Sequence, residues 1–180
     1  ITADGVVMRD IRRKIGLVFQ YPEYQLFEET VAKDVAFGPG NLGLSQEETE
    51  QRVKEAIQMV GLDYDAVKNV SPFELSGGQK RRVAIAGVIA MKPEILILDE
   101  PTAGLNPKAH DDILAMVRAI HEQEKNIIFL ISHNMNDIAA MADKVIVMDR
   151  GQVAMDGTPA QVFSRGEELK AMELALPDSM

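Results

Sequence analysis

The chain has 180 residues, 46% hydrophobic and 26% charged, a composition that supports one substantial core with a small helical annex. Its 19 basic and 28 acidic side chains give a net charge of -9, which disfavours nucleic acid as a partner. The absence of cysteine excludes disulfides, thiol catalysis and cysteine-ligated zinc, and the longest apolar runs fall far short of the roughly 20 residues that a membrane helix needs.

A buried strand is the first predicted element. The apolar run at residues 15–19 ends at Gln20, which places a polar side chain at the strand's carboxyl end. A helix of the annex follows, because Ser45 and Glu48 have the spacing of a capping box and apolar residues then recur at intervals of three and four until Gly61.

Two strand–helix–strand passages come next. Residues 76–79 open a helix that Pro93 ends, and a strand is predicted at 95–98, apolar on both faces as expected of a central parallel strand. Asn106-Pro107 begins another helix before a strand at 127–131. This alternation predicts an α/β fold with a mostly parallel sheet that binds ligands at the carboxyl ends of its strands.

The end of the chain has weaker patterns. A hairpin is predicted over residues 145–155, with its turn at 149–151, and a short helix begins at Thr158-Pro159. From Ser164 onward the tail is polar and weakly patterned.

Two carboxylates directly follow the strand at 95–98, at the sheet edge where nucleotide-hydrolysing folds bind phosphates. In that setting Asp99 would bind Mg2+, directly or through water, and Glu100 would orient and polarise the attacking water as a general base. Taken alone, the pair is equally consistent with two solvated acids in a loop.

The sequence Leu75-Ser76-Gly77-Gly78-Gln79 places a hydroxyl and backbone N–H groups at a helix amino terminus, where the helix dipole favours an anion such as a γ-phosphate. Ser76 and Gln79 also form a capping box, which needs no ligand. Two consecutive glycines weaken a helical turn by about 1 kcal/mol each relative to alanine. A helix cap does not explain why two such glycines are present, whereas close approach of the backbone to a ligand does.

Two further polar residues stand at strand ends. His133, just past the strand at 127–131, could hydrogen-bond the γ-phosphate or the attacking water from the side opposite Glu100, although a solitary histidine at a strand end is more often structural or merely exposed. Gln20 could offer its amide oxygen to Mg2+ or to the water. Neither His133 nor Gln20 is sufficient by itself to identify a nucleotide site.

In this order, Gln20, LSGGQ at residues 75–79, ILILDEPTAGL at 95–105 and His133 resemble the ATP-binding subunits of ABC transporters over nearly the whole chain. The resemblance implies one ABC ATPase domain with a P-loop NTPase-like core at residues 1–27 and 93–163. It places a helical signature subdomain at 28–92 and a tail at 164–180. It also implies that Ser76, Gly77, Gly78 and Gln79 act on ATP held by a second ATPase subunit, identical or paralogous.

A narrower resemblance comes from VFQYPEYQLF at residues 18–27 and DVAFGP at 34–39. These sequences are similar to the ATPase subunits of energy-coupling factor importers, which take up vitamins and transition-metal ions. The resemblance implies ATP and Mg2+ as cofactors, a transmembrane coupling subunit, a separate substrate-binding membrane subunit, and a peripheral place at the cytoplasmic face of the cell membrane.

That family would place residues 21–27 near a groove that receives a coupling helix of the transmembrane subunit. Tyr21, Tyr24 and Phe27 follow a strand end, where an exposed aromatic patch would suit a partner. The alternative is that these three side chains pack beneath the annex.

The chain departs from the family at two places. The phosphate loop GxxxxGK[ST] is absent, and in intact members it precedes the segment where this chain begins, with Ile1. We therefore expect an amino-terminal truncation that removes the first strands and leaves the chain inactive alone. Asn106 stands where the family usually has aspartate; it caps a helix as well but lacks the charge between the two sites.

Two other functions are considered. A soluble ABC ATPase acting on nucleic acid would need long heptad arms between Gln20 and Ser76, where the interval is short and has no sustained heptads. A non-catalytic interaction subunit fits the missing loop but not the presence of Glu100 and His133. We expect an ATP-hydrolysing subunit of an importer, with no nucleic-acid partner.

Overall fold

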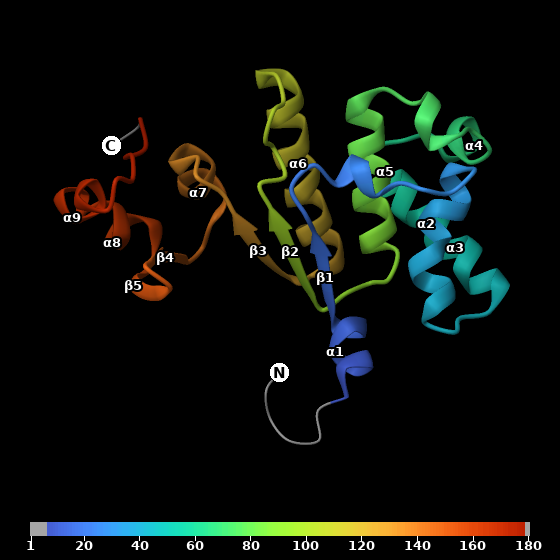
Figure 1. Ribbon diagram of the computed structural model, residues 1–180, viewed down its shortest axis with the longest axis horizontal. Helices are drawn as coiled ribbons and strands as arrows, with labels where there is room; N and C mark the ends of the chain where they lie inside the picture. Colours follow the sequence, from blue (N-terminus) through green and yellow to red (C-terminus); the bar gives the residue numbers. More distant parts are fainter. Residues whose placement is uncertain (1–6, 179–180) are drawn as a thin grey trace. The chain divides into compact units, whose positions relative to one another are not determined.

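The computed structural model describes residues 7–178, and residues 1–6 of the predicted core segment therefore lie outside the described part. Two compact units make up the chain, Ile1–Phe129 and Leu130–Met180. Between residues 7 and 178, no helix has both the length and the apolar character needed to cross a membrane. Figure 1 labels the elements of each unit.

The central sheet contains β1 (Ile15–Val18), β2 (Ile95–Asp99) and β3 (Ile127–Ile131), in the order β1-β2-β3. β1 and β2 are parallel, and Val18 pairs with Leu98. The α/β fold that the sequence predicts is confirmed, and all three strands stand where apolar runs predict them.

The two faces of the sheet differ. Gly16, Val18, Leu96 and Leu98 are buried, and α5 packs on the face that bears Gly16. Leu17 points to the opposite face and is 38% exposed. The prediction that residues 15–19 form a buried strand therefore holds for only one face of β1, because side chains alternate along a strand and α5 covers only that face.

The helical part of the first unit contains α2 (Val31–Asn41), α3 (Gln46–Met59) and α5 (Gly77–Ile89), which pack against one another (Figure 1). Ser45 caps α3 as predicted, because its hydroxyl accepts a hydrogen bond of 3.2 Å from the backbone of Glu48. The unit also contains four short elements: α1 (Met8–Lys14), α4 (Tyr64–Val67) and the 3₁₀ helices Pro22–Gln25 and Pro72–Glu74.

The longest helix of the first unit is α6 (Pro107–Glu124), and it begins as the sequence predicts. The Asn106 side chain accepts a hydrogen bond of 3.0 Å from the backbone of Ala109, and Pro107 occupies the first helical position. The predicted buried side is confirmed for Ile113, Met116, Val117 and Ile120.

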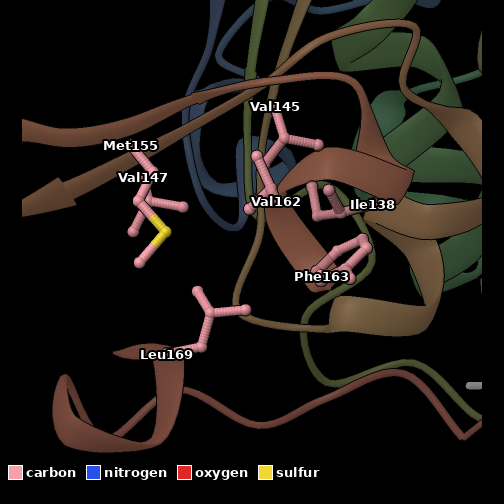
Figure 2. Packing of buried hydrophobic residues seen from close by; sticks show 7 residues of the cluster. All are labelled: Ile138, Val145, Val147, Met155, Val162, Phe163 and Leu169. Carbon is pink, nitrogen blue, oxygen red and sulfur yellow. The ribbon is translucent and has the colours of Figure 1, made fainter. Parts of the chain in front are cut away.

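The second unit contains an antiparallel hairpin, β4 (Val145–Asp149) and β5 (Gln152–Gly157), and three short helices: α7 (Met135–Met141), α8 (Pro159–Phe163) and α9 (Gly166–Ala171). Figure 2 shows its core, formed by Ile138, Val145, Val147, Met155, Val162, Phe163 and Leu169. The weakly patterned tail from Ser164 contains α9, whose Leu169 is fully buried in this core.

Candidate nucleotide site

The carboxyl ends of β1 and β2 bring three predicted site residues to one edge of the sheet. Val18 and Leu98 are partners in the parallel register, so Gln20 and Glu100 each lie two residues beyond a paired position. Asp99 is the last residue of β2 and is half-buried, as is Glu100, whereas Gln20 is exposed. Carboxylate and amide groups of adjacent strands thus share the edge where parallel sheets bind ligands.

The backbone of Glu100 has an unusual conformation. Its φ of 48° lies in the left-handed region, which costs a residue with a Cβ on the order of 1 kcal/mol. The turn that follows maintains this conformation, because the N–H of Ala103 donates a hydrogen bond of 3.1 Å to the Glu100 carbonyl. Glu100 is therefore held in a fixed, strained orientation directly after the sheet.

The side chains at this edge have the chemistry that Mg2+ prefers. The Asp99 carboxylate and the Gln20 amide are hard oxygen donors, and Mg2+ in phosphate-transferring sites uses one or two carboxylates together with the phosphates of its substrate. Residues 7–178 contain no group of three or more acidic or histidine side chains able to hold a metal ion by themselves. The donors present therefore fit an ion whose remaining ligands come from a nucleotide and water.

The signature residues form the amino terminus of α5. The Ser76 hydroxyl accepts a hydrogen bond of 3.4 Å from the Gln79 N–H, and the Gln79 amide oxygen accepts one of 3.1 Å from the Ser76 N–H. The predicted capping box is confirmed. The Gln79 amide oxygen is therefore engaged at its own helix terminus, and the backbone of Gly77 and Gly78 beside it is exposed.

Gly77 and Gly78 have no packing reason to be glycine within the described residues. A Cβ added at either position would meet no atom there within 4 Å, and neither residue has a positive φ. Alanine would stabilise the helix at both positions by up to about 1 kcal/mol. The open space above this backbone is what close approach by a molecule outside the chain requires.

His133 lies between β3 and α7 in the second unit and is exposed. The loop around it is ordered by local caps: the Ser132 hydroxyl accepts from the Asn134 N–H at 3.0 Å, and the Asn134 side chain accepts from the Asn136 N–H at 3.0 Å. The predicted contact of His133 with a γ-phosphate stays a prediction.

Arg81 is a residue that the sequence analysis does not single out. Its side chain is 3% exposed and donates to the Glu23 carboxylate and to the carbonyls of Pro101 and Ala103. A signal was available, because Arg81, Ile85 and Ile89 recur at intervals of four on the buried side of α5. An arginine on the apolar side of a helix needs an internal partner.

A cavity of about 480 Å³ lies beside α2 and α5 in the first unit. Phe27 and Phe37, two of its lining residues, meet edge to face with ring centroids 5.0 Å apart. The Asp34 carboxylate accepts from the N–H groups of Phe27 and Glu28 at 2.9 and 3.0 Å. We call this cavity the groove; it is lined by Arg12, Arg13, Gln25, Leu26, Phe27, Asp34, Phe37, Gly38, Asn41, Leu42, Ala84, Gly87, Val88 and Met91.

The aromatic residues after β1 are exposed rather than packed beneath the helices. Tyr24 is 84% exposed and Phe27 57%, and the rings of Tyr21 and Tyr24 lie 6.2 Å apart. Of the two interpretations that the sequence left open, the exposed aromatic patch is therefore the correct one.

Comparisons with known proteins agree with this arrangement. The sequence model of the ABC transporter family matches residues 2–103. The energy-coupling factor transporter ATP-binding protein EcfA2 of Clostridium perfringens is 59% identical over 172 residues, which are 96% of this chain and 60% of that protein. EcfA2 of Clostridium tetani is 58% identical over 177 residues, which are 98% of this chain and 62% of that protein. The chain thus spans about three-fifths of the length of these curated relatives.

Two solved structures share the fold. CbiO1 of Clostridium perfringens, described as part of the ABC transporter complex CbiONQ, has a TM-score of 0.79 and 38% identity over 91% of this chain and 64% of its own. A dimeric ATP-binding cassette in a post-hydrolysis state with ADP and Pi has a TM-score of 0.70 and 29% identity over 88% of this chain and 68% of its own. The strand-end carboxylates, the capped signature helix and these matches lead to one conclusion: the chain belongs to the ABC transporter family.

Proposed function

We propose that this chain is the greater part of an ATP-hydrolysing subunit that energises an importer of the energy-coupling factor type. The observation that carries the proposal is the register of β1 and β2, in which Val18 pairs with Leu98, so that Gln20, Asp99 and Glu100 follow the same edge of the sheet. The 59% identity to an energy-coupling factor transporter ATP-binding protein supports the same class of function.

Each residue of this edge has a proposed task. Asp99 and Gln20 would hold Mg2+, which when bound neutralises charge that develops on the phosphates during transfer. Glu100 would accept a proton from the attacking water, and its left-handed backbone fixes the direction from which it does so. His133 would hydrogen-bond the γ-phosphate or the same water from the opposite side.

A second ATPase subunit, identical or paralogous, would complete each site. The open backbone of Gly77 and Gly78, at the positive end of the α5 dipole, would approach the γ-phosphate of ATP held by that subunit, with Ser76 and Gln79 holding the helix terminus in shape. Asn106, at the start of α6, would lie on the path between the two sites. The dimeric state of a similar cassette supports this arrangement.

The groove would receive a helix of a transmembrane coupling subunit, which places the ATPase peripherally at the cytoplasmic face of the membrane. Its exposed Phe27 and Phe37 offer apolar contact, and Asp34 and the arginines at its rim offer charge. A separate membrane subunit would bind the imported vitamin or transition-metal ion. CbiO1, a similar protein, is itself part of a transporter complex.

The test is ATP-driven uptake by the complete subunit assembled with its membrane partners in vesicles. We expect ATP hydrolysis to accompany uptake of a labelled vitamin or transition-metal ion. Phe27→Asp should weaken assembly and lower partner-stimulated hydrolysis on the order of tenfold, because a charge enters the apolar groove. Gln58→Asp adds the same charge to the exposed side of α3 and should change neither. Uptake that proceeds without ATP, or a complex that does not bind ATP, would overturn the proposal.

A further inference from the structure

Arg81 connects three separate segments of the first unit. Its Nε and Nη2 donate to the two carboxylate oxygens of Glu23 at 3.0 and 2.9 Å. Its Nη1 donates to the carbonyls of Pro101 and Ala103 at 3.2 and 2.9 Å. The side chain is 3% exposed, so these contacts take place in the interior. A planar guanidinium donates these hydrogen bonds from several nitrogens in a fixed geometry, which a lysine cannot reproduce.

The pair with Glu23 is charged. Burial alone would raise the pKa of Glu23, but the hydrogen bonds from Arg81 and from the backbone, together with the Arg81 charge, lower the pKa below its ordinary value of 4.5. An interior ion pair of this kind is held strongly, because separating it leaves an uncompensated charge in a poorly solvated place.

The segments that Arg81 joins have different tasks in the proposed function. Glu23 belongs to the 3₁₀ helix Pro22–Gln25, which follows Gln20 and runs directly into the groove residues Gln25, Leu26 and Phe27. Pro101 and Ala103 belong to the turn that holds Glu100 in its left-handed conformation. Arg81 itself lies in the first turns of α5, just after the signature.

The neighbouring Arg82 makes different contacts from the same helix. Its Nη1 donates to the Val60 carbonyl at 2.6 Å and lies 3.9 Å from the sulfur of Met116. These contacts fix α5 against other helices and reach neither the groove segment nor the turn after Glu100. The two adjacent arginines therefore form a matched pair for experiment.

We propose that Arg81 is a positioning residue that transmits occupancy of the groove to the turn of Glu100 and to the signature. This inference rests on the proposed function. A partner that docks in the groove shifts the segment of Glu23, and the bidentate pair carries that shift to Arg81 and through its Nη1 to the two carbonyls. Stimulation of hydrolysis by the membrane partner then depends on Arg81, whereas binding of Mg-ATP does not.

The experiment compares Arg81→Gln, Glu23→Gln and Arg82→Gln in the complete subunit assembled with its membrane partner. ATP hydrolysis is measured with and without that partner, together with substrate uptake per ATP, the Kd for Mg-ATP and the temperature of unfolding. Arg81→Gln should reduce the partner's stimulation by about fivefold or more and leave the Kd within about twofold. Arg82→Gln should lower the unfolding temperature and keep the stimulation.

Glu23→Gln tests the inference if Arg81→Gln does not fold, because the Glu23 variant leaves the bonds from Arg81 to Pro101 and Ala103 in place. This variant should lose part of the partner's stimulation of hydrolysis. Arg81→Lys keeps the positive charge but not the planar set of hydrogen-bond donors, so it should not restore the partner's stimulation of hydrolysis. Stimulation within about twofold of wild type in Arg81→Gln or Glu23→Gln, or an equal loss in Arg82→Gln, overturns the inference. If the membrane partner does not stimulate hydrolysis even in the wild-type complex, the proposed function is overturned. If the wild-type complex is stimulated and the variants are stimulated equally, only the inference about Arg81 fails.

Discussion

Arg81 and Glu23, 58 residues apart in sequence, meet through two hydrogen bonds of 3.0 and 2.9 Å. The Arg81 side chain is 3% exposed and the Glu23 side chain 18%. This ion pair ties the segment after β1 to the helix that begins at the signature. It makes the stability of the first unit depend on the charge of one carboxylate.

The first prediction concerns pH. The pKa of Glu23 is lowered on folding, so its stabilising contribution is present above its ordinary value of 4.5 and is lost as the pH falls through the lower value in the folded state. We expect wild type to exceed Glu23→Gln in free energy of unfolding at pH 7, and the difference to shrink below about pH 4.5. Denaturant titrations of both proteins across this range measure it, and a difference that stays constant down to pH 3 would contradict the assignment.

The second prediction separates stability from function at the signature. Ser76→Ala removes the capping box and should lower the free energy of unfolding by about 1 kcal/mol. Gly78→Ala should raise it by about 0.5 kcal/mol, because the added Cβ meets open space and alanine favours the helix. The same Gly78→Ala should lower ATP hydrolysis by the dimer. If Gly78→Ala hydrolyses ATP at the wild-type rate, close approach of a nucleotide to this backbone is excluded.

The third prediction concerns the contact of β1 with α5. A Cβ at Gly16 would lie 2.7 Å from a methyl carbon of Val88 and 2.9 Å from the ring of Pro93. Gly16→Ala should therefore destabilise the protein by about 1–3 kcal/mol. Gly40→Ala, in α2, is the control, because a Cβ there meets no described atom within 4 Å. Thermal unfolding of both variants gives the comparison, and equal unfolding temperatures would show that β1 does not approach α5 this closely.

The fourth prediction concerns ATP binding by the 180-residue chain alone. No GxxxxGK[ST] sequence occurs in it, so no lysine of that type is available to the β- and γ-phosphates. Calorimetry should find Mg-ATP bound at least about 100-fold more weakly than by a longer version of the protein that contains such a loop. Binding of similar strength by both would mean that the phosphates are held by residues other than those proposed here.

Much of the fold could be predicted because its signals are local. Ser76 and Asn106 begin helices through bonds to residues three positions later, and these spacings are visible in sequence. Apolar runs located β2 and β3 for the same reason. The candidate site followed from where those strands end.

What the sequence did not reveal depends on contacts between distant residues. Arg81 forms hydrogen bonds with Glu23 only because α5 packs beside the segment after β1, and no local sequence pattern predicts that pairing. Leu169 is buried by the hairpin β4–β5 and α8 rather than by any periodicity of its own short helix. The apolar run around Leu17 predicts a buried strand, but the burial of each strand face depends on what covers it.

The most direct test of the central claim is the effect of Glu100→Gln on the complete subunit, measured as Mg-ATP binding by calorimetry and as ATP turnover. Glu94→Gln is the matched control: Glu94 is an exposed acid at the amino end of the same strand, 3.4 Å from Lys14. We expect Glu100→Gln to bind Mg-ATP normally and to lose at least about 100-fold in turnover, while Glu94→Gln stays within about twofold of wild type. Near-normal turnover by Glu100→Gln would remove Glu100 from the role of general base and contradict the account.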